Sequence, residues 1–338
     1  MKAVLCKEYG PPDSLVLEDV EPLKPGKGQV LINVKACGVN FPDTLIIQGK
    51  YQFKPDMPFS PGGEVAGIVK ELGEGVDQVQ VGEHVIAFTG WGGFAEEVAV
   101  DAAKIIKMPA GMDFATAAAF TLVYGTSHHA LKDRAQIQPG ETLLVLGASG
   151  GVGLAAVELG KVMGAHVIAA ASSADKLAVC QQHGADELIN YTTEDLKERV
   201  KALTKGKGVD VILDPLGGNY SEAALRSIAW KGRLLVIGFA AGDIPRIPLN
   251  LTLLKGCSIV GVFWGSFTER EPQHNQENLR ELLSWFAQGK LKPHISATYP
   301  LEQAADALKD VMNRKVKGKV VLVTGKSGTR RVERSWLA

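Results

Sequence analysis

Short apolar runs separated by turn-forming residues dominate the first part of the chain. Runs such as QVLINVKACGV, EVAGIVKELG, EHVIAF and AEEVAV have the length of strands, and Gly- and Pro-rich stretches such as PLKPGKGQ separate them. This pattern predicts a β-rich first domain. Near residue 115 the pattern changes, because ATAAAFTLVYGTSHHAL is rich in helix formers and small residues and predicts a helical segment.

From Glu141 onward, apolar runs with the length of strands alternate with segments of helical periodicity. Helices are predicted, for example, over GVGLAAVELGKVMG and over the charged, amphipathic EDLKERVKALT. Apolar strands that alternate with helices indicate a parallel sheet covered on both faces. The predicted strands are 142–146, 166–171, 187–190, 209–214, 233–238 and 258–263.

The last part of the chain predicts two helices and one strand. The helices lie near 276–288 and 301–313, and KVVLVT at 319–324 has the pattern of a strand. The ending GTRRVERSWLA is basic, and we expect it to form a loose tail. No function is assigned to it.

Composition narrows the class of protein. A length of 338 residues predicts two domains. The 37 basic and 37 acidic residues cancel, which argues against a nucleic-acid binder or a protein that binds acidic membranes. No apolar run approaches the roughly 18 residues of a membrane span, and the polar N-terminus is unlike a signal peptide. With four cysteines and no CxxC spacing, the sequence predicts a cytoplasmic protein with free thiols.

A glycine-rich turn joins the strand at 142–146 to the helix that follows it. In VLGASGGVGLAA, Ala148, Gly150 and Gly153 match the dinucleotide-binding pattern G-x-G-x-x-G, with Ala in the first position. Glycines there allow a tight turn, a close approach of a pyrophosphate and close packing of helix on strand. The phosphates are expected on the free N–H groups at the helix start, around Gly151 and Val152. The alternative is a helix-packing turn without a ligand.

The end of the second strand of this unit indicates which dinucleotide binds. NAD-binding folds carry an acidic residue there for the ribose 2′-hydroxyl, whereas this strand ends in Ala171, Ser172 and Ser173. Without the acid, a 2′-phosphate meets no repulsion, and Ser172, Lys176 and Tyr191 can receive it. The predicted cofactor is therefore NADPH. The alternative for Lys176 is an ordinary solvated helix residue.

Five segments of the chain match a known family: ACGVNFPDTLIIQGKY, PFSPGGEVAGIV, GETLLVLGASGGVGLAAVELGK, GADELINYTTEDL and VFWGSF. Together they resemble the quinone oxidoreductase branch of the medium-chain dehydrogenase/reductase superfamily, essentially from end to end. The resemblance implies an α/β fold in which a Rossmann doubly wound parallel sheet is inserted into a β-rich GroES-like catalytic domain. It implies a catalytic domain over 1–124 and 264–338, an NADPH-binding Rossmann domain over 125–263, and a substrate cleft at their junction.

Zinc-dependent alcohol dehydrogenases of that superfamily carry Cys in the early loop and G-H-E where this chain has G-G-E. Here the loop offers Asn40 in GVNFPD, and Gly63 takes the position of the His. Only Glu64 remains, and one carboxylate cannot build a zinc site that needs three protein ligands. The sequence therefore predicts no metal and a hydrogen-bonded, structural Glu64. A direct catalytic role for Glu64 is the alternative.

Without a Lewis acid, the hydride acceptor has to spread negative charge itself, as quinones and enones do. Candidate hydrogen-bond donors to such an acceptor are the Asn40 amide and the hydroxyl of Tyr51, which resembles the family's active-site tyrosine. Asp43 matches a family aspartate that would orient Asn40 or its loop. The alternative for Asn40 and Asp43 is turn chemistry, because NFPD is a strong turn sequence. The alternative for Tyr51 is a surface aromatic.

The junction and the end of the fifth strand supply further predicted cofactor contacts. Ligands of open α/β sheets bind outside the carboxyl ends of the strands, so backbone groups after the fifth strand are expected to hold the carboxamide. Phe41 and Trp264 are candidates to wall a flat acceptor slot, with a core or dimer-interface role as the alternative. The residues expected at the cofactor are Thr126, on the nicotinamide side, and Gly238, Phe239, Ala240, Phe263 and Trp264.

These features predict an NADPH-dependent quinone oxidoreductase that transfers a hydride, or single electrons, without a metal. Two alternatives stay open: reduction of an activated C=C bond in an enal, enone or enoyl thioester, and a low-turnover NADPH-binding structural protein, as in the lens crystallins of this family. The apolar edge strand SIVGVF requires a partner, and the resemblance implies that it pairs across a two-fold axis in a homodimer. Glu158 stands where quinone reductases commonly have Gln, and it is expected to affect packing more than specificity.

Overall fold

The computed structural model describes residues 1–325, which form parts of two compact units. Within the described chain, unit 1 comprises Met1–Leu122 together with residues 293–325, and unit 2 comprises Val123–Lys292. The described segments on either side of unit 2 therefore both belong to unit 1, and unit 2 is an insertion. The basic ending GTRRVERSWLA lies outside the described residues.

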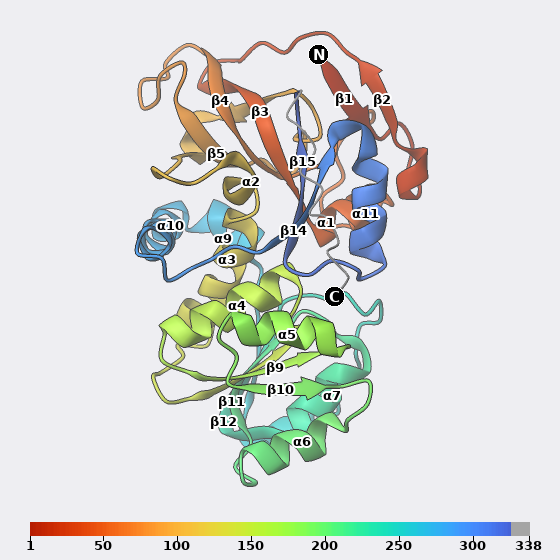
Figure 1. Ribbon diagram of the computed structural model, residues 1–338, viewed down its shortest axis with the longest axis vertical. Coiled ribbons are helices and arrows are strands. Elements are labelled where there is room, and N and C mark those ends of the chain that lie inside the picture. The colour runs from red at the N-terminus through yellow and green to blue at the C-terminus, as the bar shows by residue number, and fades with distance from the viewer. Residues whose placement is uncertain (326–338) are drawn as a thin grey trace, which may run out of the picture. The chain divides into compact units, whose positions relative to one another are not determined.

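A seven-stranded sheet forms the centre of unit 1. Its strands are β3 (Gln29–Val39), β4 (Glu64–Leu72), β5 (His84–Phe88), β6 (Glu97–Asp101), β7 (Ile105–Lys107), β14 (Ile295–Pro300) and β15 (Lys319–Val323). The order is β14-β15-β3-β4-β5-β7, with β6 also paired to β3. β15 runs antiparallel to β3, so the last described strand lies beside the first long strand (Figure 1).

Shorter elements complete unit 1. β1 (Lys2–Leu5) and β2 (Val16–Asp19) form a separate antiparallel pair. The NFPD sequence, predicted as a turn, begins helix α1 (Phe41–Ile46), which packs against α11 (Ala304–Met312). The short α2 (Phe114–Ala117) packs on β3 and β4. These contacts bury the apolar face of the sheet, which forms the core of the unit.

Unit 2 is built on a six-stranded parallel sheet of order β10-β9-β8-β11-β12-β13. The strands are β8 (Thr142–Leu146), β9 (His166–Ala171), β10 (Glu187–Asn190), β11 (Val209–Asp214), β12 (Ile228–Val236) and β13 (Ser258–Gly261). The first four have the predicted bounds. β12 begins earlier than predicted, because Ile228 pairs with Val209 of β11. β13 is an edge strand, as expected.

Helices cover both faces of this sheet (Figure 1). α4 (Gly151–Val162) and α5 (Ala174–Gln182) lie on one face, and α6 (Leu196–Leu203) and α7 (Gly218–Arg226) lie on the other. The sequence pattern predicted this doubly wound arrangement, because each apolar strand was followed by a helix. α8 (Asn250–Lys255) packs near the edge, against β12. No helix among residues 1–325 combines the length and apolar character required to cross a membrane.

Unit 2 extends beyond the predicted boundary at residue 263. Helix α3 (Thr121–His128), which starts in unit 1, continues as a π-helical turn over His129–Arg134. The elements α9 (Trp264–Arg270) and α10 (Pro272–Ala287), predicted as part of the catalytic domain, belong by their contacts to unit 2. By its contacts, unit 2 therefore continues past the expected domain end at residue 263 and reaches Lys292.

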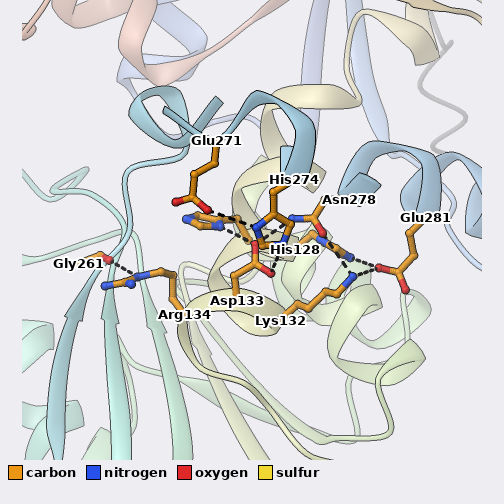
Figure 2. A network of polar contacts seen from close by, with 10 residues as sticks. His128, Lys132, Asp133, Arg134, Gly261, Glu271, His274, Asn278 and Glu281 are labelled. Atoms are coloured by element: carbon orange, nitrogen blue, oxygen red, sulfur yellow. Dashed lines mark hydrogen bonds and ion pairs between the residues drawn. The ribbon is translucent and has the colours of Figure 1, made fainter. Parts of the chain in front are cut away.

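A polar network joins α10 to the π-helical turn (Figure 2). Glu281 Oε2 lies 2.8 Å from His128 Nε2 and accepts a hydrogen bond from Lys132 at 2.6 Å. Asn278 Nδ2 donates to Asp133 Oδ2 at 2.8 Å. Each charged group in this half-buried network has an opposite charge or a polar partner, which allows α10 to pack closely on unit 2.

Candidate active site

Glu64, the first residue of β4, is completely buried in unit 1. Its Oε1 atom accepts hydrogen bonds from the Thr121 hydroxyl and the Leu122 backbone N–H, both at 2.9 Å. Its Oε2 atom accepts from Asn40 Nδ2 at 3.1 Å and lies 3.4 Å from Lys319 Nζ. Donors from the chain therefore surround both oxygens, which is how a buried carboxylate is retained. Of the two roles left open by the sequence, the geometry favours the structural one.

Asn40 precedes α1, and its backbone N–H and both polar atoms of its side chain form hydrogen bonds. Its backbone N–H donates to Asp43 Oδ2 at 2.7 Å, which caps the start of the helix. Its side-chain Oδ1 accepts from the Lys319 ammonium, and its Nδ2 donates to Glu64. Both ends of the amide are thus occupied by other residues of unit 1. The geometry supports the turn chemistry that was the alternative for Asn40 and Asp43.

Asp43 is a buried acid with a shifted pKa. Burial raises the pKa of its carboxyl to about 7, although the hydrogen bond from Asn40 and the positive charge of Lys319 act in the opposite direction. Glu64 adds a smaller increase through its negative charge. Asp43 therefore changes its charge near neutral pH, unlike an exposed aspartate.

Tyr51 lies in the loop after α1 and is half-buried. Its ring centroid lies 5.9 Å from that of Phe53. Within residues 1–325 its hydroxyl has no hydrogen-bond partner. Burial, and to a smaller extent the charge of Asp43, raises the pKa of Tyr51. The hydroxyl stays protonated at neutral pH and can donate a hydrogen bond to a ligand.

The position of Gly63 leaves no room for a metal-binding side chain. A Cβ atom there would lie 2.8 Å from the Gly90 carbonyl oxygen, closer than side chains come to backbone. The Gly63 carbonyl accepts from the Thr89 and Gly90 N–H groups at 2.7 and 3.3 Å, which fixes this approach. No group of three or more His, Cys, Asp and Glu in the described part of the chain is arranged to hold a metal ion. With Asn40 occupied as described, these residues do not fit a tetrahedral zinc ion.

The glycine-rich turn of unit 2 follows β8, at the point where the strand order reverses between β9 and β11. Dinucleotides bind at such switch points. Gly150 precedes α4, so the first N–H groups of the helix, beginning at Gly151, have no partner within it. A Cβ at Gly153 would lie 2.4 Å from the Gly147 carbonyl oxygen, so only glycine allows this packing. Together with the buried Ala148, the turn fits a pyrophosphate.

The residues predicted to receive a 2′-phosphate lie at the carboxyl ends of two adjacent strands. Lys176 Nζ donates to Ser172 Oγ at 2.9 Å, just beyond β9. The Tyr191 N–H donates to the Ala171 carbonyl at 3.2 Å, so the end of β10 lies next to the end of β9. The ring of Tyr191 packs 4.7 Å from that of Tyr220. The structure thus brings Ser172, Lys176 and Tyr191 to one edge of the sheet.

The other predicted cofactor residues of unit 2 differ in exposure. Thr126 is buried on α3, and its neighbour Ser127 donates to the Val152 carbonyl at 2.8 Å, which links α3 to the glycine-rich turn. Trp264 is also buried, with its ring against the backbone of α3, so the geometry favours its alternative as a core residue. Phe263 is 45% exposed.

The backbone after β12, predicted to hold the carboxamide, is partly engaged. The Gly238 N–H donates to the Asp214 carbonyl at 3.4 Å, and the Ala240 N–H donates to the Pro215 carbonyl at 3.0 Å. In the described chain the Phe239 N–H has no backbone acceptor. The loop therefore offers fewer donors than the sequence suggested, because two of its N–H groups already donate to backbone carbonyls at the end of β11.

Glu158 connects three segments of unit 2. It accepts a hydrogen bond from the Tyr124 hydroxyl at 2.6 Å and from the Lys292 N–H at 3.1 Å, and it lies 2.6 Å from His183 Nδ1. The side chain is buried. These contacts support the expected packing role, since they hold α3, α5 and the end of the unit on α4.

Lys319 and Thr121 belong to the Glu64 site, although no sequence pattern indicates it. Lysine at the start of a strand is ordinarily solvated, and threonine near a helix start is ordinarily a cap. The segment KGKVVLVT around Lys319 contains no acidic residue, so the sequence does not indicate a charge partner for this lysine. The only available signal in the sequence is that Lys319 begins a strand whose other residues are all apolar.

Two family models match the chain, one in each unit. One is described as the alcohol dehydrogenase GroES-like domain and matches residues 26–110; the other is described as zinc-binding dehydrogenase and matches residues 151–288. The second match does not include Asn40, Gly63 or Glu64. A relative from Nematostella vectensis, quinone oxidoreductase-like protein 2 homolog, is 43% identical over 96% of this chain and 89% of its own length.

Solved structures resemble the chain over both units. Quinone oxidoreductase of Escherichia coli, in complex with NADPH, has a TM-score of 0.89 and 29% identity, covering 96% of this chain and all of its own. The CurK enoyl reductase has a TM-score of 0.86 and 30% identity, covering 96% of this chain and 99% of its own.

Proposed function

Because the chain belongs to the medium-chain dehydrogenase/reductase superfamily, in its quinone oxidoreductase branch, we propose that it is an NADPH-dependent quinone reductase that works without zinc. The observation that carries this proposal is the closure of the Gly63 position against Gly90. With Asn40 occupied by Lys319 and Glu64, no set of three ligands remains there for a Lewis acid. The acceptor must then spread the developing negative charge itself, as a quinone does.

The residues of unit 2 support NADPH as the cofactor. When bound, NADPH supplies the hydride. The N–H groups at the start of α4, beside Gly150 and Gly153, suit its pyrophosphate. Ser172, Lys176 and Tyr191 suit a 2′-phosphate, because they offer two hydroxyl groups and a positive charge where NAD-binding folds have an acid.

Tyr51 is the proposed hydrogen-bond donor to the acceptor. A hydride and a proton convert a quinone to a hydroquinone, and the first carbonyl oxygen to gain charge needs a donor. Tyr51 has a protonated hydroxyl without a hydrogen-bond partner in residues 1–325. The side chain of Asn40, the other candidate, is engaged within unit 1, so we assign it the role of holding the loop. Transfer of single electrons instead of a hydride is a second mode open to the same site.

Steady-state assays test this function. NADPH oxidation is measured with 1,4-benzoquinone, with an alkenal and with crotonyl-coenzyme A, each with and without a chelator, and NADH replaces NADPH in parallel. We expect turnover with the quinone and NADPH that the chelator leaves unchanged. Tyr51→Phe is expected to lower kcat by about 100-fold, as for loss of one oxyanion donor. Activity that a chelator abolishes and zinc alone restores would contradict the proposal.

Reduction of an activated C=C bond is the second candidate function. The similarity to an enoyl reductase favours it, since the same fold and cofactor serve both reactions. A kcat/KM for the alkenal or the thioester above that for the quinone would identify this function. Absence of turnover with all three acceptors, together with NADPH binding, would identify a structural NADPH-binding protein.

We also propose that the chain forms a homodimer through β13. Exposed apolar side chains cluster on the elements at this edge of the sheet, and Trp230 packs against the end of α8. An apolar edge strand exposed to water requires a partner, and a second copy can extend the sheet. The exposed residues are Trp230, Leu249, Leu253, Leu254, Ile259 and Phe263.

A cytoplasmic location completes the proposal. The four cysteines are free thiols, and Cys6, Cys37 and Cys180 are buried. Unpaired cysteines suit a reducing compartment, in which NADPH is also available.

A further inference from the structure

Lys319, the first residue of β15, carries a buried ammonium group. The residue is 5% exposed. Its Nζ donates to the Val39 carbonyl at 3.0 Å and to Asn40 Oδ1, and it lies 3.4 Å from Glu64 Oε2. An ammonium has three protons to donate, and three acceptors face it. Burial of a charged lysine is rare unless it is paired in this way.

The lysine fixes the orientation of the Asn40 amide. A lysine donates hydrogen bonds and accepts none, so the Asn40 atom that faces it must be the oxygen. The amide nitrogen then points to Glu64, at 3.1 Å from Oε2, where it finds an acceptor. The opposite orientation would set the amide NH₂ against the ammonium and the oxygen against the carboxylate. Only one arrangement therefore satisfies all three side chains.

Glu64 and Lys319 also compensate each other's charge. An ionised carboxylate that is buried without a positive partner is strongly destabilised, because no water solvates it. The other donors to Glu64 are Thr121, Leu122 and Asn40, which are all neutral. Among the described residues, the positive charge that forms an ion pair with this carboxylate is that of Lys319.

This cluster holds the loop that leads to Tyr51. It joins the end of β3, the start of α1, the start of β4 and the start of β15. Asn40, whose amide Lys319 orients, also caps α1 through its backbone N–H to Asp43. The chain leaves α1 at Ile46 and reaches Tyr51 five residues later. A displaced Asn40 would therefore shift the helix that sets the position of Tyr51.

We propose that Lys319 is a positioning residue of the reductase site: it orients the Asn40 amide and neutralises Glu64, and so it holds the Tyr51 loop in its active arrangement. The inference deepens the function proposed above and rests on it. Lys319 itself touches neither substrate nor cofactor in this scheme, since its three protons are all donated within unit 1.

The test is a double-mutant cycle on the full chain with Lys319→Met, Glu64→Gln and the combination of both. The free energy of unfolding in urea is measured together with kcat and both KM values for NADPH and 1,4-benzoquinone. Lys315→Met, an exposed lysine in the same segment, is the matched control. In the combined variant the Asn40 amide can turn over, so that its oxygen accepts from the new amide at position 64.

We expect Lys319→Met to lower kcat by about tenfold or more, with KM for NADPH unchanged, because the NADPH residues lie in unit 2. The combined variant should be more stable than the sum of the two single changes predicts, by about tenfold in the unfolding equilibrium constant. Lys315→Met should alter neither quantity. A lysine that is merely structural would lower stability and leave kcat of the folded enzyme unchanged, and that result would overturn the proposal, as would strict additivity in the cycle.

A second mutant cycle tests the proposal if the Lys319→Met variant does not fold. Asn40→Asp keeps an acceptor for Lys319 but sets a carboxylate oxygen against Glu64, so it should lower kcat, and adding Glu64→Gln should restore it in part. Absence of such rescue contradicts the proposal. Failure of the quinone function is recognised separately, as a wild-type enzyme without turnover on any acceptor. In that case the unfolding cycle alone decides whether Lys319 and Glu64 are coupled.

Discussion

A Cβ atom added to Gly63 would lie 2.8 Å from the carbonyl oxygen of Gly90. Two strand-end loops thus approach so closely that residue 63 has no space for a side chain. We predict that Gly63→Ala lowers the free energy of unfolding by about 1–3 kcal/mol, since the backbone must move to admit one methyl group. Urea unfolding measures the change. Gly265→Ala, where the added atom meets only ordinary contacts in α9, is the control and should not destabilise. A neutral Gly63→Ala would show that the loops separate freely.

The raised pKa of Asp43 predicts how stability depends on pH. Its pKa is about 7 in the folded chain and about 3.9 in an unfolded one. The folded state therefore binds the Asp43 proton more tightly than the unfolded state does. The stability that this proton contributes is fully present below pH 4 and is lost as pH rises through 7. The free energy of unfolding falls by on the order of 4 kcal/mol over this range.

Asp43→Asn should remove this pH dependence, because an amide does not titrate and still accepts from the Asn40 N–H. Unfolding in urea at several values between pH 4.5 and 8 provides the measurement. The wild type should lose stability relative to Asp43→Asn as pH rises. Asp77→Asn, at an exposed position, is the matched control. Parallel curves for wild type and Asp43→Asn would contradict the assignment.

Lys176 should discriminate NADPH from NADH. Lys176→Ala removes the positive charge beside Ser172, so we predict a KM for NADPH raised about tenfold and a KM for NADH nearly unchanged. Lys201→Ala, on the exposed face of α6, should change neither value. Steady-state kinetics with both cofactors gives the result. Equal increases for NADPH and NADH would show that Lys176 does not contact the 2′-phosphate.

Glu158→Gln should destabilise unit 2. The carboxylate accepts from Tyr124 and Lys292 and pairs with His183, whereas the amide nitrogen of Gln would face a donor. We expect a loss of about 1–3 kcal/mol in the free energy of unfolding. Glu222→Gln, which breaks an exposed pair with Arg226, should change stability by less than about 0.5 kcal/mol. A stable Glu158→Gln with altered KM for NADPH would instead assign Glu158 to cofactor binding.

If the chain dimerises through the β13 edge, a single charged substitution in that interface should dissociate the dimer. Leu253 is 78% exposed, so Leu253→Glu should leave the unfolding of a monomer unaffected but place a charge in the proposed interface. Light scattering after size exclusion should give twice the chain mass for wild type and the chain mass for Leu253→Glu. Val81→Glu, at an apolar residue of unit 1 that is 62% exposed, should remain dimeric. A monomeric wild type would exclude the interface.

Local patterns were sufficient to predict most of unit 2. The strands β8 to β11 and their helices follow from apolar periodicity, and the glycine-rich turn follows from the spacing of Ala148, Gly150 and Gly153. These predictions succeed because each depends on residues close together in the chain. β12 was predicted too short, since its first residues are strand only through pairing with β11. Unit 2 continues past residue 263 for a similar reason: α10 is held by Lys132 and Asp133, far away in sequence.

The sequence by itself determined the parallel sheet, the dinucleotide turn, the strand end without an acid and the absence of the usual zinc ligands at Asn40 and Gly63. Only the tertiary structure decided which groups surround Glu64 and which way the Asn40 amide points. Lys319 and Glu64 are separated by 255 positions, and their charges meet because β15 returns to lie beside β3. Periodicity reports which face of an element is buried, but the partner of a buried charge depends on which strands become neighbours.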